Sequence, residues 1–277
     1  TDLREHLDSE LEAYNLLFEQ KEEELQETDK DPKEYPLIDG LTLDSIEYPK
    51  VDYLMNPILS TRSFNQIYGW YESGKTIFGL ALSIAMSSGN KFLDWECDNK
   101  IPSIYVESEL PGDVFKSYRW SILQGYLDEG KEFDRSNHFT LTHDDLTNAG
   151  FQYGFKSIKN RTGKAPFYFL DNMSRLATFD ENKQPDWEPF INWGIDLKNK
   201  GIPGCFLHHA NKGEGKGSSG SSFIGRLLDT SIQLTKLEDD YRFKMPGNKN
   251  LQSSIRFDKS RGFGGSSWAN KRILTMN

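Results

Sequence analysis

The stretch "GWYESGKT", residues 69–76, has the spacing G-x-x-x-x-G-K-[ST] of a loop that wraps the phosphates of a nucleotide. It lies between an apolar segment, 63–69, and a segment with helical character, 76–89. Glycines let successive backbone N–H groups curl around anionic oxygens, and a helix N-terminus adds partial positive charge. The stretch therefore predicts a nucleotide site between a strand and a helix.

Within this loop the polar residues have separate expected roles. Lys75 is expected to reach the β and γ phosphates, and the Thr76 hydroxyl is expected to ligate Mg²⁺. Glu72 adds a negative charge, which is tolerable because the cradle is main chain; it would weaken affinity by repulsion or contact an adjacent subunit. The alternative is a glycine-rich turn without ligand. The expected cofactors are ATP and Mg²⁺, held by Gly69, Glu72, Ser73, Gly74, Lys75, Thr76 and Ile77.

Strand and helix patterns alternate along the rest of the chain. Helices are expected at 76–89, 112–127 and 189–201. Strands are expected at 63–69, 102–111, 137–145, 165–176, 202–212, 226–238, 242–247 and 253–263. This alternation predicts an α/β fold with a mostly parallel central sheet, helices on both faces and antiparallel strands near the C-terminus.

The N-terminal segment has a different composition from the rest. Residues 1–34 are rich in Glu, Asp and Lys, and their apolar residues recur every three or four positions, at Leu3, Leu7, Leu11, Tyr14 and Phe18. This spacing predicts an amphipathic helix, which Pro32 and Pro36 end. The helix would fold onto its own domain or pack on a neighbouring subunit. We expect an N-terminal helical arm at 1–34 and an ATPase domain at 35–277.

Composition excludes several classes of protein. The formal charge of the 277 residues is −9, which argues against a surface that coats nucleic acid but leaves room for a narrow basic channel. The two cysteines, Cys97 and Cys205, lie in apolar contexts, so neither a disulfide framework nor a cysteine-rich zinc site is expected. The longest apolar stretch, 77–86, is too short for a bilayer. We expect a cytoplasmic protein without a signal peptide or membrane partner.

Carboxylates follow two of the predicted strands. Asp171 ends "FYFLD" and is expected to support Mg²⁺, but the next residue is Asn172, so the group that orients the attacking water must come from elsewhere. Glu107 and Glu109 lie at the end of "IYVESELP", at the sheet edge where ligands collect. Alternation would put both on one side of the strand. Glu109 is the predicted base; the structural alternative is that one of the two caps the following helix.

The motifs together resemble a known family. "YGWYESGKT", "IYVESELP", "FLDNMSRL", "LHHANKGEGKGSSGSS" and "FDKSRGF" occur in the order seen in RecA-fold ATPases, from about residue 60 to residue 265. The set is most similar to the RepA-like hexameric replicative DNA helicases, which are related to DnaB-type ring helicases. The resemblance implies a RecA-like P-loop NTPase that forms a homo-oligomer, expected to be a hexamer, and translocates on single-stranded DNA by hydrolysing ATP. A primase or other replication proteins would be further partners.

The resemblance also implies roles for single residues. The family's "YVDGEMP" glutamate, which orients the hydrolytic water, matches Glu109. The histidine that senses the γ-phosphate matches His209, whose alternative is an ordinary packed or surface histidine. The glycine-rich tract 211–222 corresponds to the loop that lines the ring channel, where Lys212 and Lys216 would contact DNA phosphates. A plain surface loop is the alternative for this tract.

Two basic residues near the C-terminus match the Lys-x-Arg of DnaB-type helicases. In that family the pair reaches the γ-phosphate held by a neighbouring subunit, and Lys259 and Arg261 match it. RepA-like proteins commonly carry an arginine before "GSS", where this chain has Ser219, so a finger role at that position is in doubt. If the match holds, efficient hydrolysis requires an oligomer. The alternative is a basic pair on the surface.

Two other functions remain open from sequence. The chain could be a RecA-fold ATPase that acts as a regulator or assembly factor without unwinding activity. It could also be an interaction module in which the nucleotide is structural, although the carboxylate at Glu109 favours an enzyme. The acidic charge and the absence of a clear aromatic stacking platform fit a helicase and a regulator equally.

Overall fold

The computed structural model describes seven parts of the chain: residues 38–47, 50–142, 148–172, 184–210, 221–237, 251–262 and 272–276. The chain divides into two units, Thr1–Lys50 and Val51–Asn277. In the first unit the structure describes the short helix α2 (Gly40–Ser45), which begins where the Asp39 carboxylate accepts a hydrogen bond of 2.7 Å from the Thr42 N–H. The predicted arm at 1–34 lies outside the described residues.

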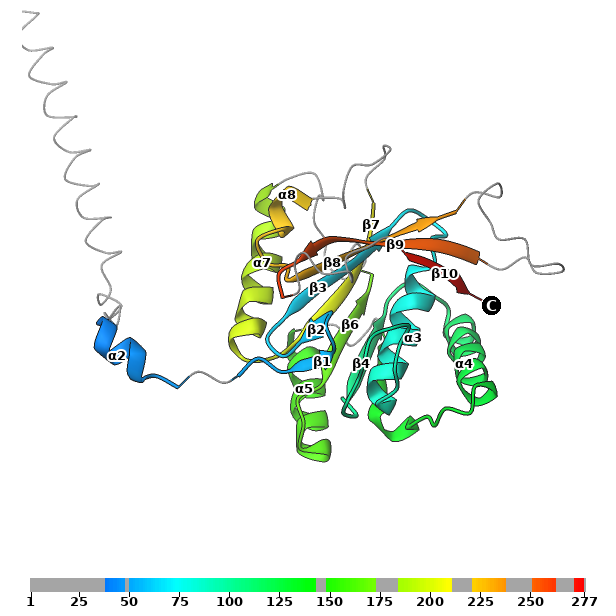
Figure 1. Ribbon diagram of the computed structural model, residues 1–277, viewed down its shortest axis with the longest axis horizontal. Helices are drawn as coiled ribbons and strands as arrows, with labels where there is room; N and C mark the ends of the chain where they lie inside the picture. Colours follow the sequence, from blue (N-terminus) through cyan, green and yellow to red (C-terminus); the bar gives the residue numbers. More distant parts are fainter. Residues whose placement is uncertain are drawn as a thin grey trace, which may run out of the picture. The chain divides into compact units, whose positions relative to one another are not determined.

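The described part of the second unit contains an eight-stranded sheet in the order β10-β9-β8-β3-β7-β6-β4-β5 (Figure 1). Neighbouring strands from β8 to β5 are parallel, whereas β9 and β10 are antiparallel. The strands are β3 (Phe64–Gly69), β4 (Ser103–Glu107), β5 (His138–Thr142), β6 (Phe167–Asp171), β7 (Gly204–His209), β8 (Thr230–Lys236), β9 (Leu251–Ser260) and β10 (Arg272–Met276). A small antiparallel pair, β1 (Tyr53–Met55) and β2 (Leu59–Ser60), precedes them.

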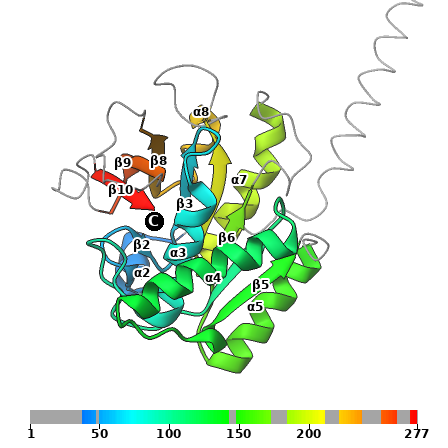
Figure 2. The same ribbon diagram turned by 90° about the vertical axis from the view of Figure 1, so that its right-hand side faces the viewer.

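Helices cover both faces of the sheet, as the sequence predicts (Figures 1 and 2). In β6, Phe167 and Phe169 pack in one buried cluster, while Tyr168 and Leu170 pack in the other. This arrangement explains why the strand is apolar at every position rather than at alternate ones. One face carries α3 (Lys75–Ser88) and α4 (Gly112–Asp128); the other carries α5 (Asn148–Thr162), α7 (Gln184–Asn199) and α8 (Ser221–Ile224).

Helix α3 connects the phosphate-type loop to the core. Its first residue is Lys75, so the helix N-terminus opens directly onto the loop. It ends at Gly89, whose φ of 69° is left-handed and whose N–H bonds to the carbonyls of Ala85 and Met86. A glycine after the last turn is a common helix end because it has no Cβ to oppose this conformation. The predicted helix at 76–89 is confirmed within one residue.

The sequence patterns missed several elements. Helix α5 was not predicted; its apolar residues Phe155 and Ile158 are three positions apart, and Ile158 is buried against the sheet. Strand β10 is defined by its pairing with β9, from Arg272 opposite Ile255 to Met276 opposite Leu251, which a local pattern does not encode. The expected strand at 242–247 lies outside the described residues.

No helix within the described ranges combines the length and the apolar character that a membrane crossing requires.

A buried histidine at the start of β5 makes the fold sensitive to acid. His138 Nε2 lies 2.9 Å from Ser83 Oγ, and the Ser83 hydroxyl donates to the Leu80 carbonyl at 2.8 Å. Because the Ser83 hydrogen is used in this way, the imidazole Nε2–H is the donor to Ser83. Burial lowers the pKa of His138 to about 3, and nearby Arg119 acts in the same direction.

The free energy of unfolding should therefore fall as pH decreases from 6.5 toward 3. In that window the unfolded chain, with a histidine pKa of 6.5, binds a proton that the folded chain does not. This single group contributes a slope of up to about 1.4 kcal/mol per pH unit. Urea unfolding of the wild type and of His138→Gln at pH 7.5, 6 and 5 measures it: the stability of the wild type relative to the variant should decrease at each step. If the difference in free energy of unfolding between the two proteins did not change with pH, the neutral, buried state of His138 would be contradicted.

Candidate nucleotide site

The loop between β3 and α3 has the backbone shape of an anion cradle. A Cβ on Gly69 would lie 2.3 Å from the carbonyl oxygen of Leu234, so only glycine fits between β3 and β8 there. Gly74 and Glu72 both have left-handed backbones, with φ values of 81° and 57°. These turns bring the chain from the end of the strand to the first N–H groups of α3, which is the arrangement that binds phosphate in other proteins.

Lys75 lies across this loop. Its Nζ donates hydrogen bonds of 3.0 Å to the carbonyls of both Gly69 and Trp70. Burial lowers the pKa of Lys75, while the charges of Asp171 and Glu109 oppose that shift. An ammonium held only by neutral carbonyls is well placed to exchange them for anionic phosphate oxygens, which bind it more strongly.

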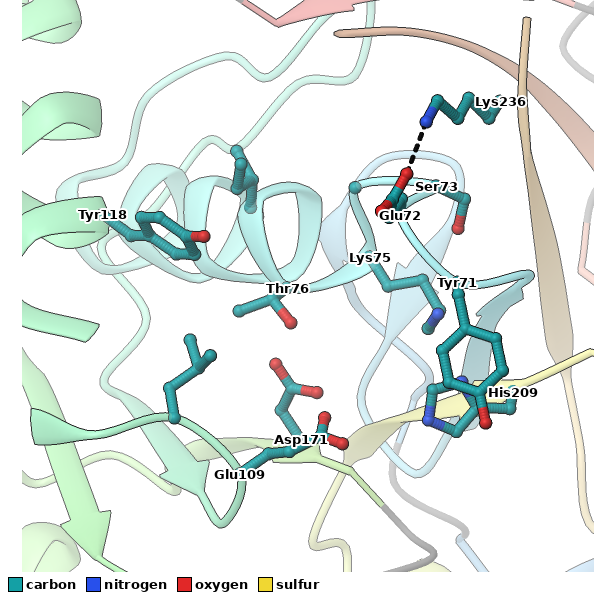
Figure 3. Close-up of a pocket in the computed structure, with 13 residues that line it drawn as sticks. Tyr71, Glu72, Ser73, Lys75, Thr76, Glu109, Tyr118, Asp171, His209 and Lys236 are labelled. Carbon is teal, nitrogen blue, oxygen red and sulfur yellow. Dashed lines mark hydrogen bonds and ion pairs between the residues drawn. The ribbon is translucent and has the colours of Figure 1, made fainter. Parts of the chain in front are cut away.

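The acidic residue of the loop has a partner in the same chain. Glu72 Oε2 lies 2.6 Å from the Nζ of Lys236, at the end of β8. Both side chains are exposed, and Figure 3 shows this pair beside the loop. An exposed pair contributes little to stability, but Lys236 offsets the charge that Glu72 brings to the pocket. From sequence, Glu72 is expected to repel the nucleotide or to contact a neighbouring subunit. A partner within the same chain is not among those expectations.

Asp171 and Thr76 face each other across the floor of the pocket (Figure 3). Asp171 is buried, its Oδ2 accepts a 2.7 Å hydrogen bond from the Tyr105 hydroxyl, and Thr76 is a further hydrogen-bond donor to it. Burial raises the pKa of Asp171 to about 7, and the charge of Glu107 adds to the effect. A buried carboxylate whose charged form is disfavoured in this way fits a site that takes a cation.

These two oxygens suit Mg²⁺ in particular. The described residues include no group of three His, Cys, Asp or Glu side chains that could hold a metal ion. Mg²⁺ retains several waters and is usually bound by one or two protein oxygens together with substrate phosphates. Thr76 and Asp171 therefore fit as the residues that would hold it.

The two glutamates after β4 have different positions. Glu107 ends the strand and is buried, and its Oε1 accepts the N–H groups of Glu109 and Leu110 at 2.7 and 2.8 Å. It caps the turn before α4 and not the helix itself, whose N-cap Pro111 carries no side-chain cap hydrogen bond, so the structural alternative of a helix cap is not what Glu107 does. Glu109 lies beyond the strand and is exposed at the pocket. The expectation that alternation places both on one side of a strand is wrong, because the strand ends between them.

A polar chain links Glu109 to the phosphate loop. Asn172 Nδ2 donates to Glu109 Oε2 at 2.8 Å and lies 3.2 Å from His209 Nε2. The His209 ring in turn packs on the Tyr71 ring, with centroids 4.7 Å apart and planes at 34°. In the sequence Asn172 is notable only because no glutamate stands there. In the structure it connects the candidate base with the candidate sensor.

These side chains line one cavity of about 430 Å³, within the range of roughly 300–1,000 Å³ typical of small-ligand sites. All of the predicted loop residues line it except Gly69, whose role is the close approach to β8. Sequence reasoning did not assign Tyr71 and Leu110, which lie within the quoted motifs, or Tyr118 and Lys236, which lie outside them. The full lining is Tyr71, Glu72, Ser73, Gly74, Lys75, Thr76, Ile77, Glu109, Leu110, Tyr118, Asp171, His209 and Lys236.

A family model described as AAA domain (AAA_25) matches residues 31–215, about two thirds of the chain. The chain belongs to this AAA domain family. It is therefore a P-loop ATPase by family. No curated protein matches it.

The architecture of this AAA domain is shared with a solved structure. The chain is similar to a KaiC-like protein from the hyperthermophilic archaeon Pyrococcus horikoshii OT3, with a TM-score of 0.53 and 14% sequence identity, over 81% of this chain and 94% of that chain. At this identity the likeness concerns the fold alone, and it confirms the predicted RecA-like class. The resemblance to replicative helicases is confirmed only at the level of a P-loop ATPase.

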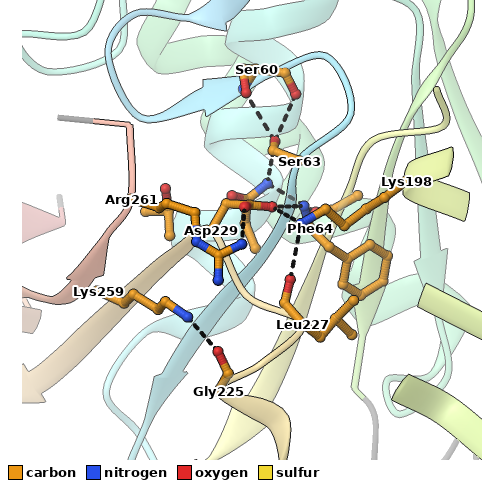
Figure 4. A network of polar contacts seen from close by, with 12 residues as sticks. Ser60, Ser63, Phe64, Lys198, Gly225, Leu227, Asp229, Lys259 and Arg261 are labelled. Atoms are coloured by element: carbon orange, nitrogen blue, oxygen red, sulfur yellow. Dashed lines mark hydrogen bonds and ion pairs between the residues drawn. The ribbon is translucent and has the colours of Figure 1, made fainter. Parts of the chain in front are cut away.

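The predicted finger residues of the AAA domain lie far from its own pocket along the sheet. Because β9 is antiparallel to β8, its last residue, Ser260, lies beside Thr230 at the start of β8. The phosphate loop follows the opposite end of β3, where Gly69 pairs with Leu234. Lys259 and Arg261 therefore do not line the pocket (Figure 4). Lys212, Lys216 and Ser219 lie outside the described residues.

Proposed function

We propose that this AAA domain hydrolyses ATP as one subunit of a ring, expected to be a hexamer, that moves along single-stranded DNA in the manner of RepA-like helicases. The observation that carries the proposal is the convergence of Lys75, Thr76, Asp171 and an exposed Glu109 in one pocket. A phosphate cradle alone would bind nucleotide. An exposed carboxylate beside it adds the group that hydrolysis requires.

The residues of the pocket have separate roles in the proposed hydrolysis. Lys75 exchanges its carbonyl contacts for phosphate oxygens. Glu109 orients the attacking water and accepts its proton, and the 2.8 Å hydrogen bond from Asn172 holds the carboxylate in place. Because Asn172 also contacts His209, loss of the terminal phosphate would be transmitted to the segment that follows β7. Bound Mg²⁺, held by Thr76 and Asp171, would supply positive charge to the phosphates.

The position of Arg261 supports the proposed ring. An arginine that stabilises transferred phosphate must reach it, and Arg261 lies at the other end of the sheet from the pocket of its own subunit. A neighbouring copy can present its pocket to that end. In the ring, the tract 211–222 with Lys212 and Lys216 would face the channel and contact the DNA backbone.

A second candidate is a RecA-fold ATPase that regulates or assembles other proteins. The net charge of −9 fits this candidate as well as the helicase, and the fold is shared with a KaiC-like protein. Such a regulator would have the same pocket and form the same ring, but it would not act on DNA.

One experiment separates the candidates: phosphate release with and without a deoxythymidine homopolymer, together with the native mass in a non-hydrolysable ATP analogue. We expect an oligomer whose turnover rises severalfold with DNA. An oligomer whose turnover ignores DNA would support the regulator. A monomer unaffected by DNA would remove the ring motor altogether.

A further inference from the structure

A carboxylate at the start of β8 gathers the residues next to the predicted finger. Asp229 Oδ2 accepts hydrogen bonds from Lys198 Nζ at 2.6 Å and from the Phe64 N–H at 2.9 Å. Its Oδ1 lies 3.1 Å from Arg261 Nη1. The Asp229 side chain is only 18% exposed. Figure 4 shows these groups converging on it from three separate elements.

The backbone of Asp229 joins the same elements. Its N–H bonds to the Phe64 carbonyl at 2.8 Å, and its carbonyl accepts the N–H of Arg261 at 2.8 Å. Main chain and side chain together thus tie the end of β9 to the starts of β8 and β3. Lys259, two positions before Arg261, donates to the Gly225 carbonyl at the same end of the sheet. Main-chain and side-chain contacts with Asp229 therefore determine the location of Arg261.

Arg261 is held on one side only. Its side chain is 53% exposed, and among the described residues Nη1 is the only guanidinium nitrogen with a partner. A guanidinium presents five N–H donors in a rigid fork, so one edge can bind a carboxylate while the other binds a second anion. Two cations, Lys198 and Arg261, contact the single carboxylate of Asp229, and Lys259 bonds to the nearby Gly225 carbonyl.

We propose that Asp229 is a positioning residue for hydrolysis at the neighbouring subunit: it holds Arg261 extended at the subunit edge, so that the free nitrogens meet the terminal phosphate bound by an adjacent copy of this chain. The inference rests on the proposed ring ATPase. Lys198 neutralises the second oxygen of Asp229 and fixes the carboxylate. Without Asp229, the long Arg261 side chain must be ordered anew at each encounter with phosphate.

A subunit-mixing experiment tests this role. Glu109→Gln keeps Arg261 but lacks the base, and Arg261→Ala keeps the base but lacks the finger; each alone is expected to be inactive. In equimolar mixed rings about a quarter of the sites combine an intact Glu109 with an intact Arg261 from the next copy, as head-to-tail ring interfaces allow. Turnover should recover to about that fraction of the wild type.

The Asp229 substitution is then added to the Glu109→Gln subunit, which supplies the intact Arg261 and is called the donor. Replacing the Glu109→Gln donor with Glu109→Gln/Asp229→Asn should lower the recovered kcat about tenfold, the scale of ordering one long side chain, with KM for ATP unchanged. The matched donor is Glu109→Gln/Asp196→Asn, which removes an exposed carboxylate paired with Lys200 on the nearby helix α7. It should restore turnover as well as the parent donor.

Folding effects are separated from positioning by two readouts. Native mass measures whether each donor enters the mixed ring, and recovery is compared at equal incorporation. Asp229→Glu keeps the charge but displaces the carboxylate by one methylene. It replaces Asp229→Asn in the donor if that variant does not fold, and it should cause a similar loss of recovered turnover. Full recovery with either Asp229 donor at equal incorporation would overturn the inference. Absence of recovery in the parental mixture would instead count against the proposed ring ATPase.

Discussion

Replacing Arg261 with alanine is expected to lower ATP turnover by about 10³-fold, because an arginine supplied by a neighbour stabilises charge that grows in the transition state. Nucleotide affinity of the same subunit should be unchanged, since Arg261 lies at the opposite end of the sheet from its own pocket. Steady-state phosphate release and equilibrium binding of a fluorescent ATP analogue measure the two quantities separately.

The matched control for this prediction is Arg256→Ala. Arg256 is an exposed arginine of β9, the strand that Arg261 directly follows, and its Nε pairs with Asp258 at 2.7 Å rather than with the cluster around Asp229. Its loss should leave turnover near the wild-type rate. If Arg261→Ala turned over ATP normally while the protein remained an oligomer, the basic pair would be an ordinary surface feature and the ring would need another finger.

Replacing Glu109 with glutamine is expected to lower turnover by about 10²–10⁴-fold, the usual range for removing a general base. The amide has the same shape, and its carbonyl oxygen can still accept the hydrogen bond that Asn172 donates to Glu109. The turn capped by Glu107 should therefore persist. Nucleotide should still bind, because the cradle and Lys75 are untouched.

Two comparisons make the Glu109 result interpretable. Lys75→Ala should lose ATP binding as well as turnover, because the ammonium that spans the loop is removed. Glu188→Gln removes an exposed carboxylate on α7, away from the pocket, and should change neither. Full turnover by Glu109→Gln would mean that the attacking water is activated elsewhere. Normal binding with no turnover in any form of the protein would favour a structural nucleotide.

The parts of the site that the sequence predicted correctly are those with strict local requirements. A phosphate loop needs a glycine where Gly69 meets the Leu234 carbonyl, a left-handed glycine at Gly74 and a lysine directly after it. These requirements place particular residues at fixed spacings in the sequence, where they can be recognised. Asp171 was found in the same way, because a carboxylate directly after an apolar strand reaches the ligand edge of a parallel sheet.

The residues that sequence reasoning missed act through partners that are distant along the chain. Asn172 links Glu109 to His209, and Lys236 neutralises Glu72. Asp229 bonds to residues of β3, α7 and the end of β9. None of these contacts has a fixed spacing in sequence, so none forms a motif.

The amino-acid sequence by itself determined that this protein has a phosphate-binding loop, an alternating α/β fold and carboxylates at the ends of two strands. These features depend on backbone conformation and burial within a few residues. Only the tertiary structure decided that Glu107 caps a turn while Glu109 faces the pocket, and that Arg261 lies away from its own nucleotide site. The reason is that strand order and strand direction place side chains from distant segments side by side, and local sequence does not encode either.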